Sequence, residues 1–331
     1  MSFNDFKAWT IDRKISFSVF ALFVVVLFCN LLVGFLIEDD VHAIKNSPIG
    51  ENISILAKKS VENNLNEALL YKEVNILIKE ADSEMLNRQF YVQITYNLFT
   101  FLVLSLLLGK LFLANGIKSF TLENKTPILF VASIIVAINI QVIGSDALKL
   151  NEMLGLDYLQ ELISNTDKEK VRENMILQYV MFLPNSERGW LITTIGLALI
   201  PAIGEELMFR GYLMKLFSDK FNTHNGIALS ALLFALIHFN LTNFFYYFVL
   251  GVVLGYMYHW GKNILFPIIV HFIHNASVVI DYVGIISNSE TNLNTDIGFS
   301  QQSYSLMAYF TVALCLVIFF MNYKRRKYLI K

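Results

Sequence analysis

Long apolar runs constrain the fold of this chain more than any other feature of its sequence. Eight runs are long enough, or nearly so, for a helix to cross the roughly 30 Å hydrocarbon core of a bilayer. They are 15–37, 94–114, 127–145, 190–217, 226–241, 243–260, 263–286 and 304–323. With 55% hydrophobic and only 16% charged residues, the chain is too apolar for a soluble protein of 331 residues. We therefore expect an all-α fold, a polytopic transmembrane helix bundle of about eight spans.

Two hydrophilic stretches, 39–93 and 146–189, separate some of these runs. In 53–90, leucine and isoleucine recur at helical spacing among lysine and glutamate, which predicts an amphipathic helical hairpin. The segment from Leu150 to Ile163 has a similar pattern and predicts one further helix. We expect these extracytoplasmic amphipathic helices to cover the bundle or to bind a partner.

The runs and stretches together divide the chain into four parts. Residues 1–145 hold the first three spans with the insertion 39–93, and residues 146–189 form a second extracytoplasmic segment. Residues 190–286 form a helical core that contains most of the buried polar residues, and residues 287–331 hold the final span and a basic tail.

Lysine and arginine in the short connections predict the orientation. They gather before the first run, in 115–126, in 215–225, at 261–262 and in the tail, whereas the intervening connections 240–242 and 287–303 have none. The positions include Lys118, Lys220, Lys262 and Lys331. Because these residues accumulate in short cytoplasmic loops, we expect a multi-pass protein of the cell membrane with both termini cytoplasmic.

The run 190–217 contains three charged residues, Glu205, Glu206 and Arg210, within six positions. One ionised side chain at the centre of a membrane helix costs roughly 2.5 to 3.5 kcal/mol, so these charges need partners or a function. Glu206 and Arg210 are four apart and can pair on one helix face as a supporting pair. Glu205 has no obvious local partner and is the candidate general base, with Glu206 as the alternative base.

Neighbouring runs contain three more candidate residues, His238, His271 and Asn275. A lone histidine in a span is most often bonded to a backbone carbonyl and has no chemical role. However, counting from the inner helix ends places Glu205, His238 and Asn275 at a common depth of about 18 Å, with His271 one turn shallower. We therefore expect one site with a cavity that opens toward the cytoplasm, which His274 could assist.

The order of these motifs resembles the CPBP intramembrane protease family, also called the Abi or type II CAAX prenyl protease-like family. The motifs are Glu-Glu-x-x-Phe-Arg-Gly at 205–211, Phe-x-x-x-His at 234–238 and His-x-x-x-Asn at 271–275, and the resemblance covers about 190–286. It implies an intramembrane endopeptidase. In that reaction Glu205 and His238 would activate a water molecule, and His271 and Asn275 would bind the oxyanion.

The resemblance leaves the cofactor open. Glu205, His238 and His271 match the three-ligand pattern of catalytic zinc, with water as the fourth ligand. The family has been described both as metalloproteases and as metal-free glutamate proteases. This chain lacks the sequence His-Glu-x-x-His. We favour the metal-free chemistry, with Zn²⁺ as the alternative.

The expected partners are membrane lipid and a peptide or protein substrate, membrane-associated or lipidated, that enters from the cytoplasmic side. A net charge of -1 gives no support for nucleic-acid binding. Two other functions compete with proteolysis. A catalytically silent scaffold or bacteriocin-immunity protein should have lost motif residues, and here all are present. A proton- or cation-coupled transporter would often show two matching halves, but residues 1–165 contain no counterpart of the charged segment.

Overall fold

The computed structural model describes residues 3–63, 65–116, 120, 122–164, 168–288 and 301–329. Lys118, Lys331 and most of the connection 287–303, which entered the orientation argument, lie outside them. Within the described ranges the chain is helical, apart from loops and one isolated bridge between Leu122 and Asn263. The structure is therefore the expected all-α membrane bundle.

The first half of the bundle runs from α1 to α9. Its helices are α1 (Phe3–Lys7), α2 (Ile11–Lys45), α3 (Pro48–Glu62), α4 (Glu67–Glu80), α5 (Ser83–Asn97), η1 (Leu98–Val103), α6 (Leu104–Phe112), α7 (Pro127–Met153), α8 (Leu156–Ser164) and α9 (Lys168–Phe182).

The second half contains the candidate site. Its helices are α10 (Gly189–Thr194), η3 (Ile195–Leu199), α11 (Ile200–Glu206), η4 (Leu207–Leu213), α12 (Met214–Lys220), α13 (Thr223–Leu236), η5 (Leu241–Asn243), α14 (Phe244–Gly261), α15 (Leu265–Asn288) and α16 (Gln301–Leu329).

Seven helical stretches of the described chain are long and apolar enough to cross a membrane. The eighth expected span, 226–241, is wrong, because α13 has 14 residues and measures only about 21 Å at 1.5 Å per residue. Its last turn is closed by the His238 ring, whose Nδ1 lies 2.6 Å from the Phe234 carbonyl oxygen. The chain then turns through Phe239, which has a left-handed φ of 49°. α13 and α14 consequently form a hairpin inside the bundle.

The segment from Gly189 to Lys220 is one continuous helix with two π-helical stretches, η3 and η4. Such wide turns occur most often at functional sites. Pro201, which has no N–H to donate to the preceding turn, follows η3. Gly204 allows close packing, because a Cβ there would lie 3.1 Å from the backbone nitrogen of Leu102. This helix therefore lies directly against η1 at the level of Glu205.

Several helix ends that carry basic residues meet at one end of the bundle. Lys220 at the end of α12 forms an ion pair with Asp12 at the start of α2. The backbone N–H of Glu123 donates to the Lys262 carbonyl after α14 over 3.1 Å. Arg326 near the end of α16 lies 4.0 Å from the same Glu123 side chain. These ends are the ones that the lysine and arginine distribution predicts to lie on a common side.

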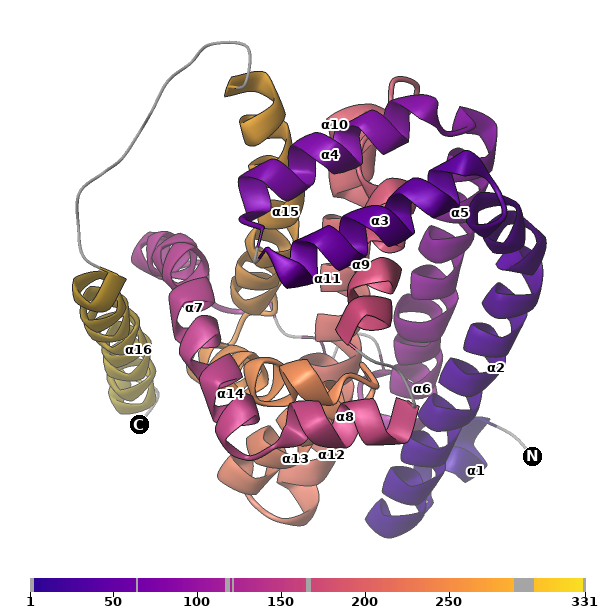
Figure 1. Ribbon diagram of the computed structural model, residues 1–331. Coiled ribbons are helices and arrows are strands. Elements are labelled where there is room, and N and C mark those ends of the chain that lie inside the picture. The colour runs from indigo at the N-terminus through magenta and orange to yellow at the C-terminus, as the bar shows by residue number, and fades with distance from the viewer. Residues whose placement is uncertain are drawn as a thin grey trace.

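The opposite end is covered by α3, α4 and α9, which we call the cap (Figure 1). The cap has its own hydrophobic core, which includes Ile53, Val74 and Val180. Tyr282 near the end of α15 also belongs to this core, and its hydroxyl donates to Asn75 Oδ1 over 2.9 Å. The expected amphipathic hairpin is thus present as α3 and α4, and the two hydrophilic stretches pack on each other.

The segment from Leu150 to Ile163 differs from the single helix expected. It contains the end of α7 and the whole of α8, separated by Gly155 with a left-handed φ of 69°. The side chain of Asn151 explains the bend, because its Nδ2 donates to the Thr242 carbonyl over 2.6 Å. The end of α7 is therefore fixed to the turn between α13 and α14.

Arg188 joins the cap to the helix of the candidate site. Its side chain is 3% exposed and donates to the carbonyls of Leu86, Met181 and Leu183. The guanidinium also lies 4.3 Å from the centre of the Phe90 ring. Burial lowers the pKa of Arg188 to about 10. The side chain nevertheless satisfies carbonyl groups where α9 ends and where the helix from Gly189 begins.

Candidate active site

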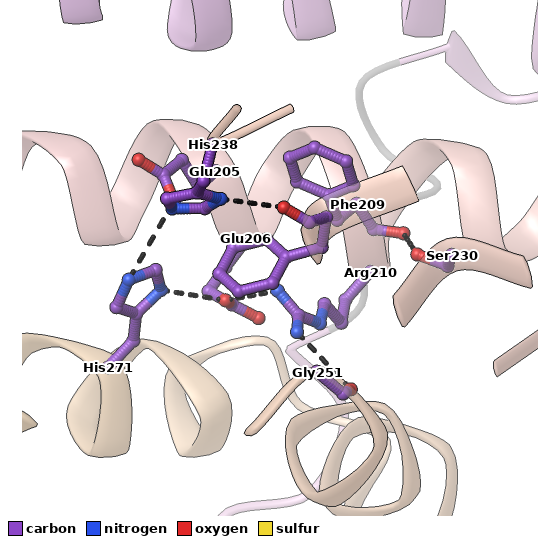
Figure 2. A network of polar contacts seen from close by, with 9 residues as sticks. Glu205, Glu206, Phe209, Arg210, Ser230, His238, Gly251 and His271 are labelled. Carbon is purple, nitrogen blue, oxygen red and sulfur yellow. Dashed lines mark hydrogen bonds and ion pairs between the residues drawn. The ribbon is translucent and has the colours of Figure 1, made fainter. Parts of the chain in front are cut away.

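Glu205 and Glu206 are the last two residues of α11, directly before the π-helical stretch η4. Both are buried, and Glu206 Oε1 accepts a hydrogen bond of 2.6 Å from Arg210 Nη1 (Figure 2). Arg210 Nη2 donates to the Gly251 carbonyl on α14 over 3.2 Å. The guanidinium lies 4.6 Å from the Phe234 ring centre on α13. The expected Glu206–Arg210 pair is therefore present and joins three helices.

His271 on α15 contacts both glutamates. Its Nδ1 lies 2.9 Å from Glu206 Oε1, and its Nε2 lies 3.7 Å from Glu205 Oε2. Because a carboxylate paired with Arg210 accepts hydrogen bonds, Nδ1 carries the proton and Nε2 is the atom that faces Glu205. Sequence analysis missed the contact between His271 and Glu206. No spacing in the sequence pointed to it, because the two residues lie on different helices.

The ring of His238 is held from two sides. Its Nδ1 donates to the Phe234 carbonyl, which can only accept, so the neutral ring keeps an unprotonated Nε2. The ring of Tyr247 stacks on it, with centroids 4.0 Å apart and an interplanar angle of 21°. His238 thus presents a lone pair in a fixed orientation, which is suited to accept a hydrogen bond from water.

Glu205, His238 and Asn275 line a common cavity of about 970 Å³. His274 and Tyr247 line it as well. The structure thus brings three of the four expected catalytic residues to one space, and His271 lies behind Glu205 at 3% exposure. Glu205 Oε2 has no hydrogen-bond partner among the described residues. This oxygen is therefore a buried acceptor in contact with His271, on a residue that lines the cavity.

The cavity extends toward the cap. Gln178 and Phe182 of α9 and Val279 of α15 contribute to its lining, whereas the helix ends near Lys220 and Lys262 do not. This differs from the expected opening at the basic end. The space on that side of the site is filled by a small hydrophobic core, whose buried members are Met214, Ile227, Tyr258, Ile264 and Ile268.

The donor set does not form a zinc site as the side chains are placed. The described residues contain no group of three or more His, Cys, Asp or Glu side chains that could hold a metal ion. Glu205 and His271 approach each other, whereas the His238 ring bonds the Phe234 carbonyl and stacks on Tyr247. The alternative ligand set therefore lacks its third member.

Sequence analysis also missed the tyrosines of the site. Tyr247 stacks on His238, and the Tyr246 hydroxyl lies 2.9 Å from His274 Nε2. The available signal was two adjacent hydroxyl groups in the otherwise apolar start of the run 243–260. Gly251, one turn further along, was a second signal, because its carbonyl is the acceptor for Arg210.

Residues 187–277 match the family model described as type II CAAX prenyl endopeptidase Rce1-like. UPF0177 protein YbdI of Lactococcus lactis subsp. lactis (strain IL1403) is 38% identical over 103 residues, which are 31% of this chain and 52% of that protein. Uncharacterized protein YpbD of Bacillus subtilis (strain 168) is 35% identical over 86 residues, which are 25% of this chain and 41% of that protein. The chain thus spans about half the length of the first relative and about two fifths of the second. No solved structure matches the chain significantly.

Proposed function

We propose that the protein is an intramembrane endopeptidase of the cell membrane, because residues 187–277 match the Rce1-like family model. Its substrate is a membrane-associated or lipidated peptide or protein. One observation carries the proposal: Glu205, whose Oε2 has no hydrogen-bond partner among the described residues, lines the same cavity as the His238 ring, whose Nε2 is free to accept.

In the proposed reaction, Glu205 removes a proton from a water molecule that also donates a hydrogen bond to His238 Nε2. The resulting hydroxide attacks the carbonyl carbon of the scissile peptide bond. Glu205 then passes its proton to the leaving nitrogen, the C–N bond breaks, and a carboxylic acid and an amine are released. A carboxylate kept away from competing donors is well placed for this exchange.

Oxyanion stabilisation falls first to Asn275, whose side chain lines the cavity one turn after His271. One preset donor of this kind is worth about 3 to 4 kcal/mol of transition-state stabilisation. His271 supports the same reaction from behind Glu205. Its orientation is set by Glu206 and Arg210, which makes that pair a scaffold for the base.

The route of the substrate follows from the shape of the cavity. Because the lining continues to α9 and not to the helix ends near Lys220, we propose that the peptide reaches Glu205 from the half of the bilayer that the cap covers. This replaces entry from the basic, cytoplasmic end. The proposed reaction requires no metal ion, because Glu205 and His238 act on the water molecule directly.

The test compares membrane peptides from cells that contain the wild-type chain with those from cells that contain Glu205→Gln. This substitution keeps the shape of the side chain and removes its ability to accept a proton. We expect peptides that appear only with the wild type, at equal protein levels and equal melting temperatures. A Glu205→Gln chain that releases the same peptides would refute the role of Glu205. No difference from cells without the protein would favour the silent scaffold.

A further inference from the structure

Four carboxamide side chains line the catalytic cavity on elements outside the Rce1-like region. They are Asn30 on α2, Gln93 and Asn97 on α5, and Gln178 on α9. We call them the amide wall. α5 packs against α2, α9 and α11, so it places the wall and Glu205 around the same space. Among the residues that the structure describes, the lining contains no lysine or arginine, and Glu205 is its only acidic residue.

The wall has unused hydrogen-bonding capacity. Asn97 is 8% exposed and Gln93, four residues earlier on the same helix face, is half-buried. Neither side chain, nor that of Gln178, has a hydrogen bond within the part of the chain that the structure describes. The amide atoms of Gln93 and Asn97 are not among the fully buried atoms that lack a partner, so they are accessible from the cavity that these residues line.

Another buried amide shows what a structural role looks like in this protein. Asn151 is fully buried, and its Nδ2 donates to the Thr242 carbonyl while its Oδ1 accepts from the Phe245 N–H. The donor and the acceptor of the Asn151 side chain thus both stabilise the turn between α13 and α14. Gln93 and Asn97 hold nothing comparable, and their free donors and acceptors face the cavity.

The chemistry of the wall matches a peptide backbone. The Asn30 side chain forms a hydrogen bond with Tyr96. The carboxamides of Gln93, Asn97 and Gln178 each offer two N–H donors and one carbonyl acceptor without charge, which is the complement of successive backbone C=O and N–H groups. A substrate must be extended where it is cut, and inside a bilayer its backbone groups then have no water to pair with. Charged ligands find no opposite charge in the wall.

We propose that Asn30, Gln93, Asn97 and Gln178 form a subsite that binds an extended, uncharged stretch of substrate through its backbone. The inference rests on the proposed peptidase function and adds how the substrate is held beside Glu205. Recognition through the backbone makes the enzyme tolerant of substrate side chains and intolerant of a backbone without N–H groups. Gln93 and Asn97 form the buried part of the subsite, and Asn30 and Gln178 its exposed part.

The test uses the full chain with Glu205→Gln in lipid nanodiscs, so that bound peptide is not consumed. The probes are an end-blocked library of uncharged octapeptides and the same library with every internal backbone nitrogen methylated. Mass spectrometry of the washed nanodiscs measures how much of each library is retained. We expect about tenfold less retention of the methylated library, because its backbone has lost its hydrogen-bond donors.

Two wall variants and one control show where this selectivity comes from. Gln93→Leu and Asn97→Leu, each added to Glu205→Gln, should reduce the difference between the libraries to less than about threefold. Thr95→Val, at an exposed position of α5 outside the cavity, should leave it unchanged. Melting temperatures confirm that each variant is folded. The comparison of the two libraries on Glu205→Gln alone tests the subsite without any wall variant.

Equal retention of the two libraries, or no retention above empty nanodiscs, would overturn the subsite. The outcome is separable from that of the proposed function. A chain that selects the unmethylated library while its wild type cuts no membrane peptide would keep the subsite and lose the peptidase. A chain that cuts membrane peptides without selecting between the libraries would keep the peptidase and lose the subsite.

Discussion

At the scale of single residues, Arg210 determines whether the two glutamates can stay buried. It pairs with Glu206, donates to the Gly251 carbonyl and covers the Phe234 ring, at 1% exposure. We expect Arg210→Ala to lower the free energy of unfolding by about 3 to 5 kcal/mol, because Glu206 then remains buried and unpaired. Denaturant unfolding in detergent measures this loss.

The control is Lys149→Ala, which breaks the exposed pair with Asp146 and should cost no more than about 1 kcal/mol. The scaffold role of Arg210 predicts reduced stability together with reduced activity. If Arg210→Ala is as stable as the wild type but inactive, Arg210 acts in the reaction itself.

Whether the site binds zinc also depends on the positions of single side chains. A zinc site needs three protein ligands that converge, and Glu205, His238 and His271 do not form such a group. We expect activity of the purified protein to survive a strong chelator, and elemental analysis to find far less than one metal ion per chain. Loss of activity that added zinc restores would identify a metalloprotease.

The sequence predicts contacts of the site that lie within one helix, but not those between helices. Glu206 and Arg210 could be paired from their spacing, because both lie on one helix. The contact between Glu206 and His271 depends on how α15 packs against α11, which no spacing within one helix encodes. Tyr247 and the amide wall were missed for the same reason.

At the scale of elements, the close approach of α13 and α14 sets the position of the Arg210 acceptor. A Cβ added at Gly251 would lie 2.8 Å from Ala231 Cβ and 3.0 Å from its Cα. We expect Gly251→Ala to cost about 1 to 3 kcal/mol of stability, because the hairpin must open to admit the methyl group. Thermal unfolding and peptide release, measured on the same preparation, should both decline.

Gly34→Ala on α2 is the matched control, since a Cβ there has nothing within 4 Å. It should leave stability unchanged or slightly raised, because alanine loses less backbone entropy in a helix than glycine does. Equal effects of the two substitutions would show that α13 and α14 tolerate a wider separation.

The elements that sequence analysis predicted well are those whose length alone defines them. Seven of the eight expected spans correspond to helices long enough to cross a membrane. The eighth was wrong because its apolar run continues to Leu241, past the point where the His238 side chain closes α13. A hydropathy profile gives the length of an apolar run. It does not show where a side chain ends the helix inside that run.

At the scale of the whole molecule, the arrangement of the two ends tests the orientation. Lys220 lies at the basic end and Lys58 is exposed on the cap. In a background with Cys29 and Cys315 replaced by serine, we expect Lys58→Cys to react with a membrane-impermeant thiol reagent in intact cells. Lys220→Cys should react only after the membrane is opened, because basic connections stay in the cytoplasm. The reverse pattern would place the cap inside the cell.

One helix, α15, contributes to the core of the bundle and to the core of the cap. Phe266 and Val270 lie in the core of the bundle, and Tyr282 lies in the core of the cap. His271 and Asn275 lie between them on the same helix. Because the two ends of α15 are packed in different cores, a displacement of the cap would strain the helix turn between them. The cap and the helix turn that contains His271 and Asn275 are therefore mechanically coupled through α15.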